Sequence, residues 1–393
     1  MKNDLNTSSL SDNFIGQGMF EILNVVQKLE REGKKIYHFE LGEPHHETHP
    51  KIVNKLISSI KNGNTRYTSS FGLYDLREKI RLSTKYSRNF KPDIEQVLIT
   101  PGANSIIYFL IKTICNKGDE VILPNPGFPS YIAACRANGV KIRTLNLNQN
   151  NNYQIEYDSL SKLINKKTKL LIINSPSNPL GVIQNKNNLI DIYNLIKKNN
   201  IYVLTDEIYS RITFNKNEFF SISTLDKCKK NVVILNGFSK SFSMTGYRVG
   251  CAIGPKDIIN KMRLLVETIV SCVPPFIQES CSAALDLNNN FVLKNNLDYL
   301  KKRNKIISKF NQTKLEFVTP NGAFYIFPSL KRYGVDGETF CRNILLKYGI
   351  ALVPGIFFGS QGNYNFRMSY TSDTRSLEKA LDLILTYLKS IQK

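Results

Sequence analysis

The stretch that decides the fold of this chain is Asn236-Gly237-Phe238-Ser239-Lys240-Ser241-Phe242-Ser243-Met244-Thr245-Gly246-Tyr247-Arg248-Val249-Gly250. One apolar run, residues 232–235, leads into this loop, and a second, residues 249–253, leads out of it. A loop of small residues between two short apolar runs is typical of an α/β protein, which presents polar groups at the end of its sheet. The pattern therefore predicts two buried strands joined by a polar loop.

Two cationic residues of this loop, Lys240 and Arg248, are candidates for a catalytic and a ligand-binding role. A lysine in a partly dry pocket beside another cation has a lowered pKa and becomes a nucleophile toward carbonyl groups. An arginine offers a planar fork that suits a phosphate. A solvated surface lysine in a serine-rich loop explains the same residues equally well, so these residues alone leave both interpretations open.

The spacing Ser-Lys-x-x-x-x-x-Gly-x-Arg-x-Gly, which runs from Ser239 to Gly250, closely resembles the cofactor-lysine motif of a known family. That family is the fold-type I pyridoxal-phosphate enzymes, specifically the aspartate-aminotransferase-like class I/II aminotransferases. Further landmarks that resemble the family occur in the family's order from about residue 14 to 375, which is nearly the whole chain. They include Leu41-Gly42-Glu43-Pro44, Tyr67-Thr68, Val353-Pro354-Gly355 and Phe358-Gly359.

The order of elements along the chain predicts an α/β fold. Strand-like and helical segments alternate from residue 97 to about residue 253, which favours a mostly parallel sheet sandwiched by helices. The region after residue 290 has the pattern of a smaller α+β domain, and the resemblance implies a fold-type I PLP-transferase. We expect a flexible N-terminal arm at 1–13, a segment that packs with the small domain at 14–48, a large PLP-binding domain at 49–290 and a small C-terminal domain at 291–393.

Three short motifs follow predicted strands, where ligand-binding groups of α/β proteins lie. Gly102-Ala103-Asn104 begins a predicted helix, whose free N–H groups can hold an anion, although a turn glycine is an equally simple explanation. Phe128 can lie flat on a ligand ring or pack within its loop. Asn178 precedes a proline and can donate to a phenolate oxygen or form an Asx turn.

Three further residues stand out because of their neighbours. Asp206 ends a predicted strand three residues before Tyr209; a lone Asp there is usually a helix N-cap, but Asp-x-x-Tyr matches the family closely. Arg367 lies in an otherwise apolar strand. A guanidinium is rarely buried without a planar anionic partner, so it binds a carboxylate or forms a structural salt bridge.

The resemblance assigns the catalytic roles. Lys240 is expected to hold pyridoxal 5'-phosphate as a Schiff base, and its released amine to move the substrate proton. Asp206 is expected to pair with the pyridine nitrogen, and Tyr209 and Asn178 to contact the ring oxygen, while Phe128 stacks on the ring.

The resemblance also assigns the binding roles. The phosphate is expected to contact Ser239, Arg248 and the backbone of Gly102-Ala103-Asn104. Tyr67 is expected to reach the phosphate of the neighbouring subunit, which implies a homodimer. The substrate is expected to contact Gly42, Asn178 and Arg367, the last through its α-carboxylate.

These features predict an aminotransferase that moves an amino group between an L-amino acid and a 2-oxo acid by a ping-pong mechanism, within amino-acid metabolism. The same residues also serve β-lyases, decarboxylases and cyclopropane-forming synthases, which stay open as alternatives. The chain departs from the family in ways that limit the substrate prediction. Asn104 stands where some aspartate-specific relatives have a lysine, Gly237 where many members have a phosphate-binding serine, and Ile356 and Phe357 where small polar residues are common. These departures predict a pocket that is more apolar than that of a dicarboxylate enzyme, unless His45, His46 or Arg66 supplies the missing charge.

The net charge of +21 raises the alternative of a basic nucleic-acid-binding regulator. The lysines are spread along the chain, however, and such regulators carry a DNA-binding domain ahead of the catalytic one. We therefore expect small-molecule partners and no nucleic acid. No apolar run is long enough to cross a membrane and the N-terminus lacks an apolar signal core, so we expect a cytoplasmic protein with no membrane partner.

Histidine and cysteine are the side chains that most often bind zinc. The seven cysteines are scattered and form no CxxC pair, so neither a zinc ribbon nor a disulfide framework is indicated. His45, His46 and His49 cluster, but prolines on either side disfavour the helical spacing of a zinc site. We expect no metal and a loop near the substrate entrance.

Overall fold

The computed structural model describes residues 7–9, 11–214 and 219–392 of the chain. In this part of the chain a seven-stranded sheet forms the centre of the large domain, in the order β2-β8-β7-β6-β5-β3-β4. Strand β8 runs antiparallel to both of its neighbours, whereas the pairs from β7 to β4 are parallel. The strands are β2 (Val97–Pro101), β3 (Glu120–Asn125), β4 (Lys141–Asn146), β5 (Thr168–Asn174), β6 (Tyr202–Asp206), β7 (Val232–Gly237) and β8 (Val249–Ile253).

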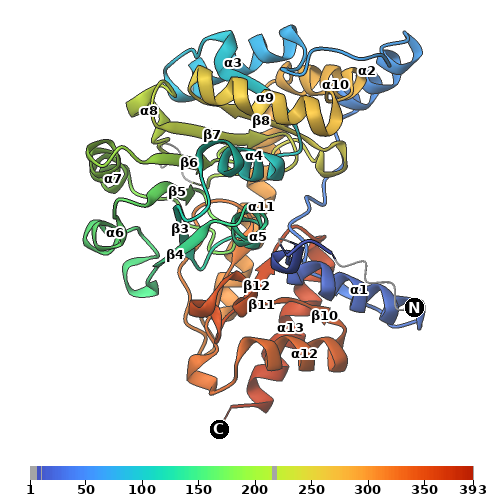
Figure 1. Cartoon of the computed structure of the whole chain (residues 1–393). Helices are drawn as coiled ribbons and strands as arrows, with labels where there is room; N and C mark the ends of the chain where they lie inside the picture. The colour runs from blue at the N-terminus through green and yellow to red at the C-terminus, as the bar shows by residue number, and fades with distance from the viewer. Residues whose placement is uncertain (1–6, 10, 215–218, 393) are drawn as a thin grey trace, which may run out of the picture.

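Helices cover both faces of this sheet, as the α/β pattern predicts (Figure 1). The reason lies in the alternation of apolar side chains, since successive residues of a strand point to opposite faces. Leu204 packs with one buried cluster, to which α4 and α9 contribute, and its neighbour Val203 packs with another, to which α7 contributes. The helices are α2 (Pro50–Lys61), α3 (Tyr74–Arg88), α4 (Asn104–Ile114), α5 (Pro129–Ala137), α6 (Tyr157–Leu163), α7 (Lys186–Lys198), α8 (Ser223–Asp226), α9 (Lys256–Val270) and α10 (Pro275–Leu285).

The C-terminal part of the chain forms a separate layer of helices and short strands, drawn from orange to red in Figure 1. Within the described residues, a three-stranded antiparallel sheet has the order β11-β12-β9, and β1 near the N-terminus pairs in parallel with β10. Through this pairing β1 joins this layer, while the division into segments at 14–48, 49–290 and 291–393 stays a prediction. The elements are α1 (Gly18–Arg31), β1 (Tyr37–His38), α11 (Asn290–Phe310), β9 (Tyr325–Ile326), α12 (Gly337–Tyr348), β10 (Ile350–Ala351), β11 (Val353–Pro354), β12 (Phe366–Ser369) and α13 (Thr374–Ser390).

Some local predictions need correction. Strand β1 is only two residues long, because its pairing with β10 ends at the hydrogen bond from the N–H of Phe39 to the backbone oxygen of Ala351. Elements β4, α6, α8, α9 and α10 were not predicted. Most of the expected arm at 1–13 lies outside the described residues, and Ser11–Asn13 within it form a short 3-10 helix.

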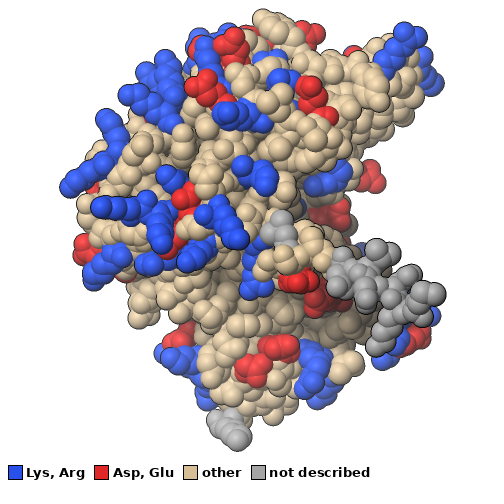
Figure 2. Space-filling model, viewed as in Figure 1, with Lys and Arg blue, Asp and Glu red and all other residues tan. Residues whose placement is uncertain are grey.

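The surface is charged over much of the face seen in Figure 2, where Lys and Arg side chains outnumber Asp and Glu. They are most frequent over the side on which α6 and α7 lie, and acidic side chains are interspersed among them. None of the helices in the described ranges is both long and apolar enough to span a membrane.

Candidate active site

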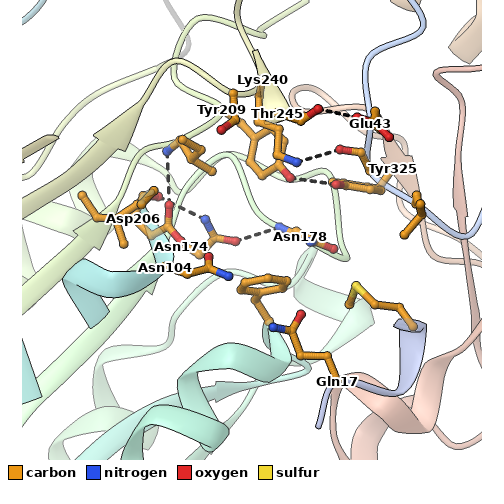
Figure 3. Close-up of a pocket in the computed structure, with 18 of the residues that line it drawn as sticks. Gln17, Glu43, Asn104, Asn174, Asn178, Asp206, Tyr209, Lys240, Thr245 and Tyr325 are labelled. Carbon is orange, nitrogen blue, oxygen red and sulfur yellow. Dashed lines mark hydrogen bonds between the residues drawn. The ribbon is translucent and has the colours of Figure 1, made fainter. Parts of the chain in front are cut away.

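A cavity of about 460 Å³ lies at the carboxyl edge of the large sheet, against the N-terminal segment and the C-terminal layer (Figure 3). Parallel strands deliver their last residues to this edge, which is where open α/β sheets bind ligands. Most of the predicted site residues line it. They are Gly42, Ala103, Asn104, Phe128, Asn178, Asp206, Tyr209, Ser239, Lys240, Arg248 and Arg367.

Lys240 extends from the loop after β7 toward the N-terminal segment. Its Nζ donates a hydrogen bond to the backbone oxygen of Gly42 at 2.7 Å. Burial lowers the pKa of Lys240 to about 8, and the guanidinium groups of Arg367 and Arg248 act in the same direction. More of this amine is therefore uncharged near neutral pH than in an ordinary lysine, and the uncharged form is the nucleophile toward a carbonyl carbon.

Asp206 is the last residue of β6 and is buried at the floor of the cavity. Its Oδ2 accepts a hydrogen bond from the hydroxyl of Tyr131 at 2.6 Å, and its Oδ1 accepts one from the N–H of Ile208 at 3.2 Å. Burial raises the pKa of Asp206 to about 6, although both hydrogen bonds oppose this shift by favouring the carboxylate. A buried carboxylate of this kind is suited to a protonated ring nitrogen.

Hydroxyl and amide groups line another part of the cavity. The hydroxyl groups of Tyr209 and Tyr325 lie 2.7 Å apart and share a hydrogen bond. The backbone N–H of Asn178 donates to Oδ1 of Asn174 at 2.7 Å, which fixes the loop after β5 (Figure 3). These groups can donate to an oxygen substituent of a bound ring.

Arg367 lies on β12 and is fully buried. Its Nη1 donates to Oδ1 of Asn178 at 3.1 Å, its Nη2 donates to the backbone oxygen of Glu40, and its guanidinium lies 4.7 Å from the ring centroid of Tyr325. The Nε–H of Arg367 is buried without a hydrogen-bond partner in the described structure. No side-chain carboxylate neutralises this cation at ion-pair distance among the described residues, so the arrangement is suited to the carboxylate of a ligand.

The opposite end of the cavity provides an anion site. Gly102 has a φ of +78°, and a Cβ there would lie 2.5 Å from Nη2 of Arg248. A Cβ on Gly250 would lie 2.6 Å from the backbone nitrogen of Ala103, so β8 packs directly against the start of α4. Both glycines let the Arg248 side chain and the first N–H groups of α4 come together, with Ser239 in the same wall. Such a helix start beside a guanidinium suits a phosphate.

Two of the predicted residues do not line the cavity. Gly102 lies behind Arg248, as described above, and the Tyr67 side chain is 87% exposed on the surface of the chain. In the histidine loop, Nδ1 of His49 accepts from the N–H of Lys51 at the start of α2, and Nε2 of His46 lies 3.1 Å from Oδ2 of Asp298. Across the described ranges no group of three or more His, Cys, Asp or Glu side chains could hold a metal ion.

Several residues at the cavity were not predicted from the sequence: Gln17, Met19, Phe20, Glu43, Asn174, Thr245 and Tyr325 in its lining, and Tyr131 behind Asp206. Asn174 could have been found, because it begins the Asn-Ser-Pro-Ser-Asn-Pro string at the end of a predicted strand. Tyr131 and Tyr325 lie in segments that read as apolar, where their hydroxyl groups carry no separate signal.

The residues present fit pyridoxal phosphate. An amine of lowered pKa, a buried carboxylate and an anion site at a helix start line one cavity, and these match the aldehyde, the ring nitrogen and the phosphate of that cofactor.

Comparison with known proteins agrees with this site. The family model "Aminotransferase class I and II" matches residues 34–384. The (5-formylfuran-3-yl)methyl phosphate transaminase of Methanocaldococcus jannaschii is 33% identical over 96% of this chain and 98% of its own length. Aromatic-amino-acid aminotransferase 2 of Thermococcus litoralis is 31% identical, with 89% and 90% covered.

Solved structures show the same architecture. The crystal structure of an aspartate aminotransferase from Thermotoga maritima superposes with a TM-score of 0.92 at 28% identity, covering 98% of this chain and 100% of that one. The chain therefore belongs to the class I and II aminotransferase family, and it is a pyridoxal-phosphate-dependent transaminase of the aspartate-aminotransferase-like type.

Proposed function

We propose that Lys240 is the amine that forms the Schiff base with pyridoxal phosphate, and that the chain transfers amino groups between an L-amino acid and a 2-oxo acid in a ping-pong cycle. The observation that carries this proposal is the single cavity that holds Lys240, Asp206 and Arg367 together. When bound, the cofactor supplies the electron sink for the carbanion at Cα of the substrate.

Side chains of the protein carry out the proton transfer and hold the cofactor. The amine of Lys240, once released, removes the proton from Cα and returns it, because its pKa of about 8 allows both protonation states near neutral pH. Asp206 holds the ring nitrogen in its protonated form, and Tyr131 holds Asp206. Arg248, Ser239 and the start of α4 bind the phosphate, and Tyr209 and Asn178 contact the ring oxygen.

We infer that Arg367 binds the substrate α-carboxylate, and that the side-chain end of the pocket favours neutral, apolar or aromatic amino acids. Among the described residues, the cationic side chains lining the cavity are Lys240, Arg248 and Arg367, and each already has a role at the cofactor or the α-carboxylate. Asn104 carries no charge for a distal carboxylate. The walls are supplied instead by Met19, Phe20, Leu41 and Phe128.

We also propose a homodimer in the cytoplasm. Tyr67 is exposed in the single chain, and so are apolar side chains of α2 and α9, including Ile57, Ile60, Leu264 and Ile269, which supports a partner on this side. The seven cysteines are unpaired, and six of them are buried as thiols, which is common in a reducing compartment.

The test is the visible absorption of the purified protein after pyridoxal phosphate is added, followed during titration with single L-amino acids. The proposal expects that an apolar or aromatic L-amino acid bleaches the band of the bound cofactor and that a 2-oxo acid restores it. Borohydride reduction should then fix the cofactor on the peptide containing Lys240, as detected by mass spectrometry.

Lys240→Ala should abolish this covalent label, whereas the exposed Lys229→Ala should keep it. A label on any other lysine would contradict the assignment of Lys240. Bleaching by aspartate or glutamate alone would contradict the predicted substrate class while leaving the site intact.

A further inference from the structure

A second cavity, of about 160 Å³, lies behind the active site on the opposite face of the sheet. Alternate residues of a strand point to opposite faces, and β7 follows this rule. Leu235 lines the active-site cavity, whereas Ile234 and Asn236 line the second one. The second cavity is therefore separated from the first by the sheet and by the loop that carries Lys240.

The first cationic side chain at this cavity, that of Arg88 on α3, forms an ion pair with a carboxylate. Its Nε donates to Oε2 of Glu207 at 2.7 Å, and the two side chains are 7% and 0% exposed. The other carboxylate oxygen, Oε1, accepts hydrogen bonds from the hydroxyl groups of Thr205 and Ser221. The carboxylate of Glu207 is thus occupied by these three neighbours.

A second guanidinium, that of Arg211, lines the same cavity. Its Nη2 donates to the hydroxyl of Ser83 at 2.8 Å, and its guanidinium carbon lies 5.4 Å from the ring centroid of Phe242. Within the ranges 7–9, 11–214 and 219–392, no carboxylate oxygen lies within ion-pair distance of Arg211. Burial lowers the pKa of Arg211, and the nearby charge of Arg88 adds to the effect.

Of these two guanidinium groups, Arg88 is paired with Glu207, whereas Arg211 has no carboxylate partner among the described residues. Within that part of the chain, the positive charge of Arg211 therefore faces a partly apolar cavity without an opposite charge. A buried guanidinium usually has a planar anionic partner. The remaining walls are of two kinds. Hydroxyl groups come from Ser83, Ser87 and Ser210, and apolar surface comes from Ile234, Phe219, Phe238 and Phe242.

We propose that this cavity is a binding site for a small organic carboxylate, whose carboxylate group pairs with Arg211 and whose apolar part lies against Phe238 and Phe242. A planar carboxylate accepts two parallel N–H bonds from a guanidinium, and the aromatic wall distinguishes an organic acid from an inorganic anion. Phe238 and Phe242 stand on either side of Lys240 in sequence, so the ligand contacts the segment that carries the catalytic amine.

The test is calorimetric titration of the pyridoxal-phosphate-loaded protein with benzoate. We expect two sites per chain, one at Arg367 in the active site and one at Arg211. Arg211→Gln should weaken the second site about 10- to 100-fold, since a hydrogen-bonded ion pair is replaced by a neutral contact. Arg367→Gln should remove the other site, and the double variant should bind no benzoate.

Matched controls separate this effect from a loss of structure. Arg263→Gln removes a guanidinium that already pairs with Glu267 on α9 and should keep both sites. Circular dichroism and the cofactor absorption band should be unchanged in Arg211→Gln. If that variant does not fold, Ser83→Ala, which removes the hydroxyl that holds Arg211, should weaken the second site alone.

One benzoate site per chain in the unaltered protein would overturn the proposal. So would two sites of unchanged affinity in Arg211→Gln. Saturable binding of sulfate at Arg211 without binding of benzoate would overturn the assignment to an organic carboxylate.

Discussion

At the scale of single residues, Asp206 depends on its surroundings to remain a carboxylate. A buried acid is normally driven toward its neutral form, and here the Tyr131 hydroxyl and the Ile208 N–H favour the charged form. We expect Asp206→Asn to lower kcat by about 150- to 5000-fold, because breaking a buried ion pair costs roughly 3–5 kcal/mol and each 1.36 kcal/mol is about tenfold in rate. Steady-state kinetics would measure this. Asp226→Asn, which alters a buried carboxylate that accepts backbone N–H groups far from the cavity, should lower the melting temperature rather than kcat.

The Tyr131 hydroxyl gives a prediction about pH. Its hydrogen bond lowers the pKa of Asp206, so Tyr131→Phe should raise that pKa, by up to about one unit for a single net hydrogen bond. Because the carboxylate form binds the protonated ring nitrogen, cofactor affinity should fall as pH drops through about 6 in the unaltered protein, and at higher pH in the variant. Fluorescence titration with pyridoxal phosphate between pH 5 and pH 8 would locate both midpoints. An unchanged midpoint would contradict this role of Tyr131.

Lys240 gives a second prediction about pH, which concerns the rate of covalent attachment of the cofactor. Burial places its pKa near 8, and the uncharged amine is the form that attacks the cofactor aldehyde. The rate of covalent attachment should therefore rise with pH and level off above about 8. Arg367→Gln removes a neighbouring cation that lowers this pKa, so its midpoint should lie at higher pH. Stopped-flow absorbance after mixing apoprotein with pyridoxal phosphate would measure both curves, and a midpoint that moved to lower pH would contradict the argument.

Sequence reasoning located the site residues that carry a charge or stand in a short polar motif at a strand end. Arg367 was identified because a charged side chain is unusual inside an apolar strand, whereas Lys240 and Asp206 were assigned by the resemblance of their motifs to the family. Tyr131 and Tyr325 were not, since a tyrosine in an apolar segment has the same pattern whether its hydroxyl faces the core or a cavity. Only the three-dimensional arrangement shows that these two hydroxyl groups contact Asp206 and Tyr209.

At the scale of elements, the anion site depends on the close packing of β8 against the start of α4. Gly250→Ala would place a Cβ 2.6 Å from the backbone nitrogen of Ala103, which forces the helix start away from Arg248. We expect the affinity for pyridoxal phosphate to fall by about 10-fold or more, because one or more charged hydrogen bonds to the phosphate are lost. Equilibrium dialysis would measure the affinity. Gly16→Ala, whose Cβ would meet no atom within 4 Å, is the matched control and should bind normally.

The success of prediction differed between elements for a physical reason. Strands β5, β6 and β7 are buried on both faces and appear in the sequence as continuous apolar runs, so they were predicted. Strand β4 lies at the edge of the sheet, where its Lys141–Asn146 sequence is mostly polar and only Leu145 is buried, so no continuous apolar run marks it. Helix α9 has an apolar face at Ile258, Ile259, Met262 and Val266, whose spacing is the one expected of a helix.

At the scale of the whole molecule, one residue that the family resemblance assigns to the active site, Tyr67, lies outside the cavity of its own chain. Tyr67 lies on the surface with its side chain 87% exposed, while Lys240 and Arg248 line the cavity of the same chain. If Tyr67 binds the phosphate held by the neighbouring chain, each complete site needs two chains. This arrangement predicts a specific behaviour of mixed dimers.

Tyr67→Phe should lower the affinity for pyridoxal phosphate by about 10-fold, because a hydrogen bond to the charged phosphate is lost. In a hybrid of one Tyr67→Phe chain and one Lys240→Ala chain, the lysine-bearing site takes its tyrosine from the other chain. Its affinity should return to that of the unaltered protein. Differently tagged chains, refolded together and separated by affinity, allow the lysine-bound cofactor to be titrated in the hybrid alone. If Tyr67 served the site of its own chain, the lysine-bearing site of the hybrid would keep the weakened affinity, because its own chain carries Tyr67→Phe. Full affinity in the hybrid therefore requires that the tyrosine reaches across the dimer interface.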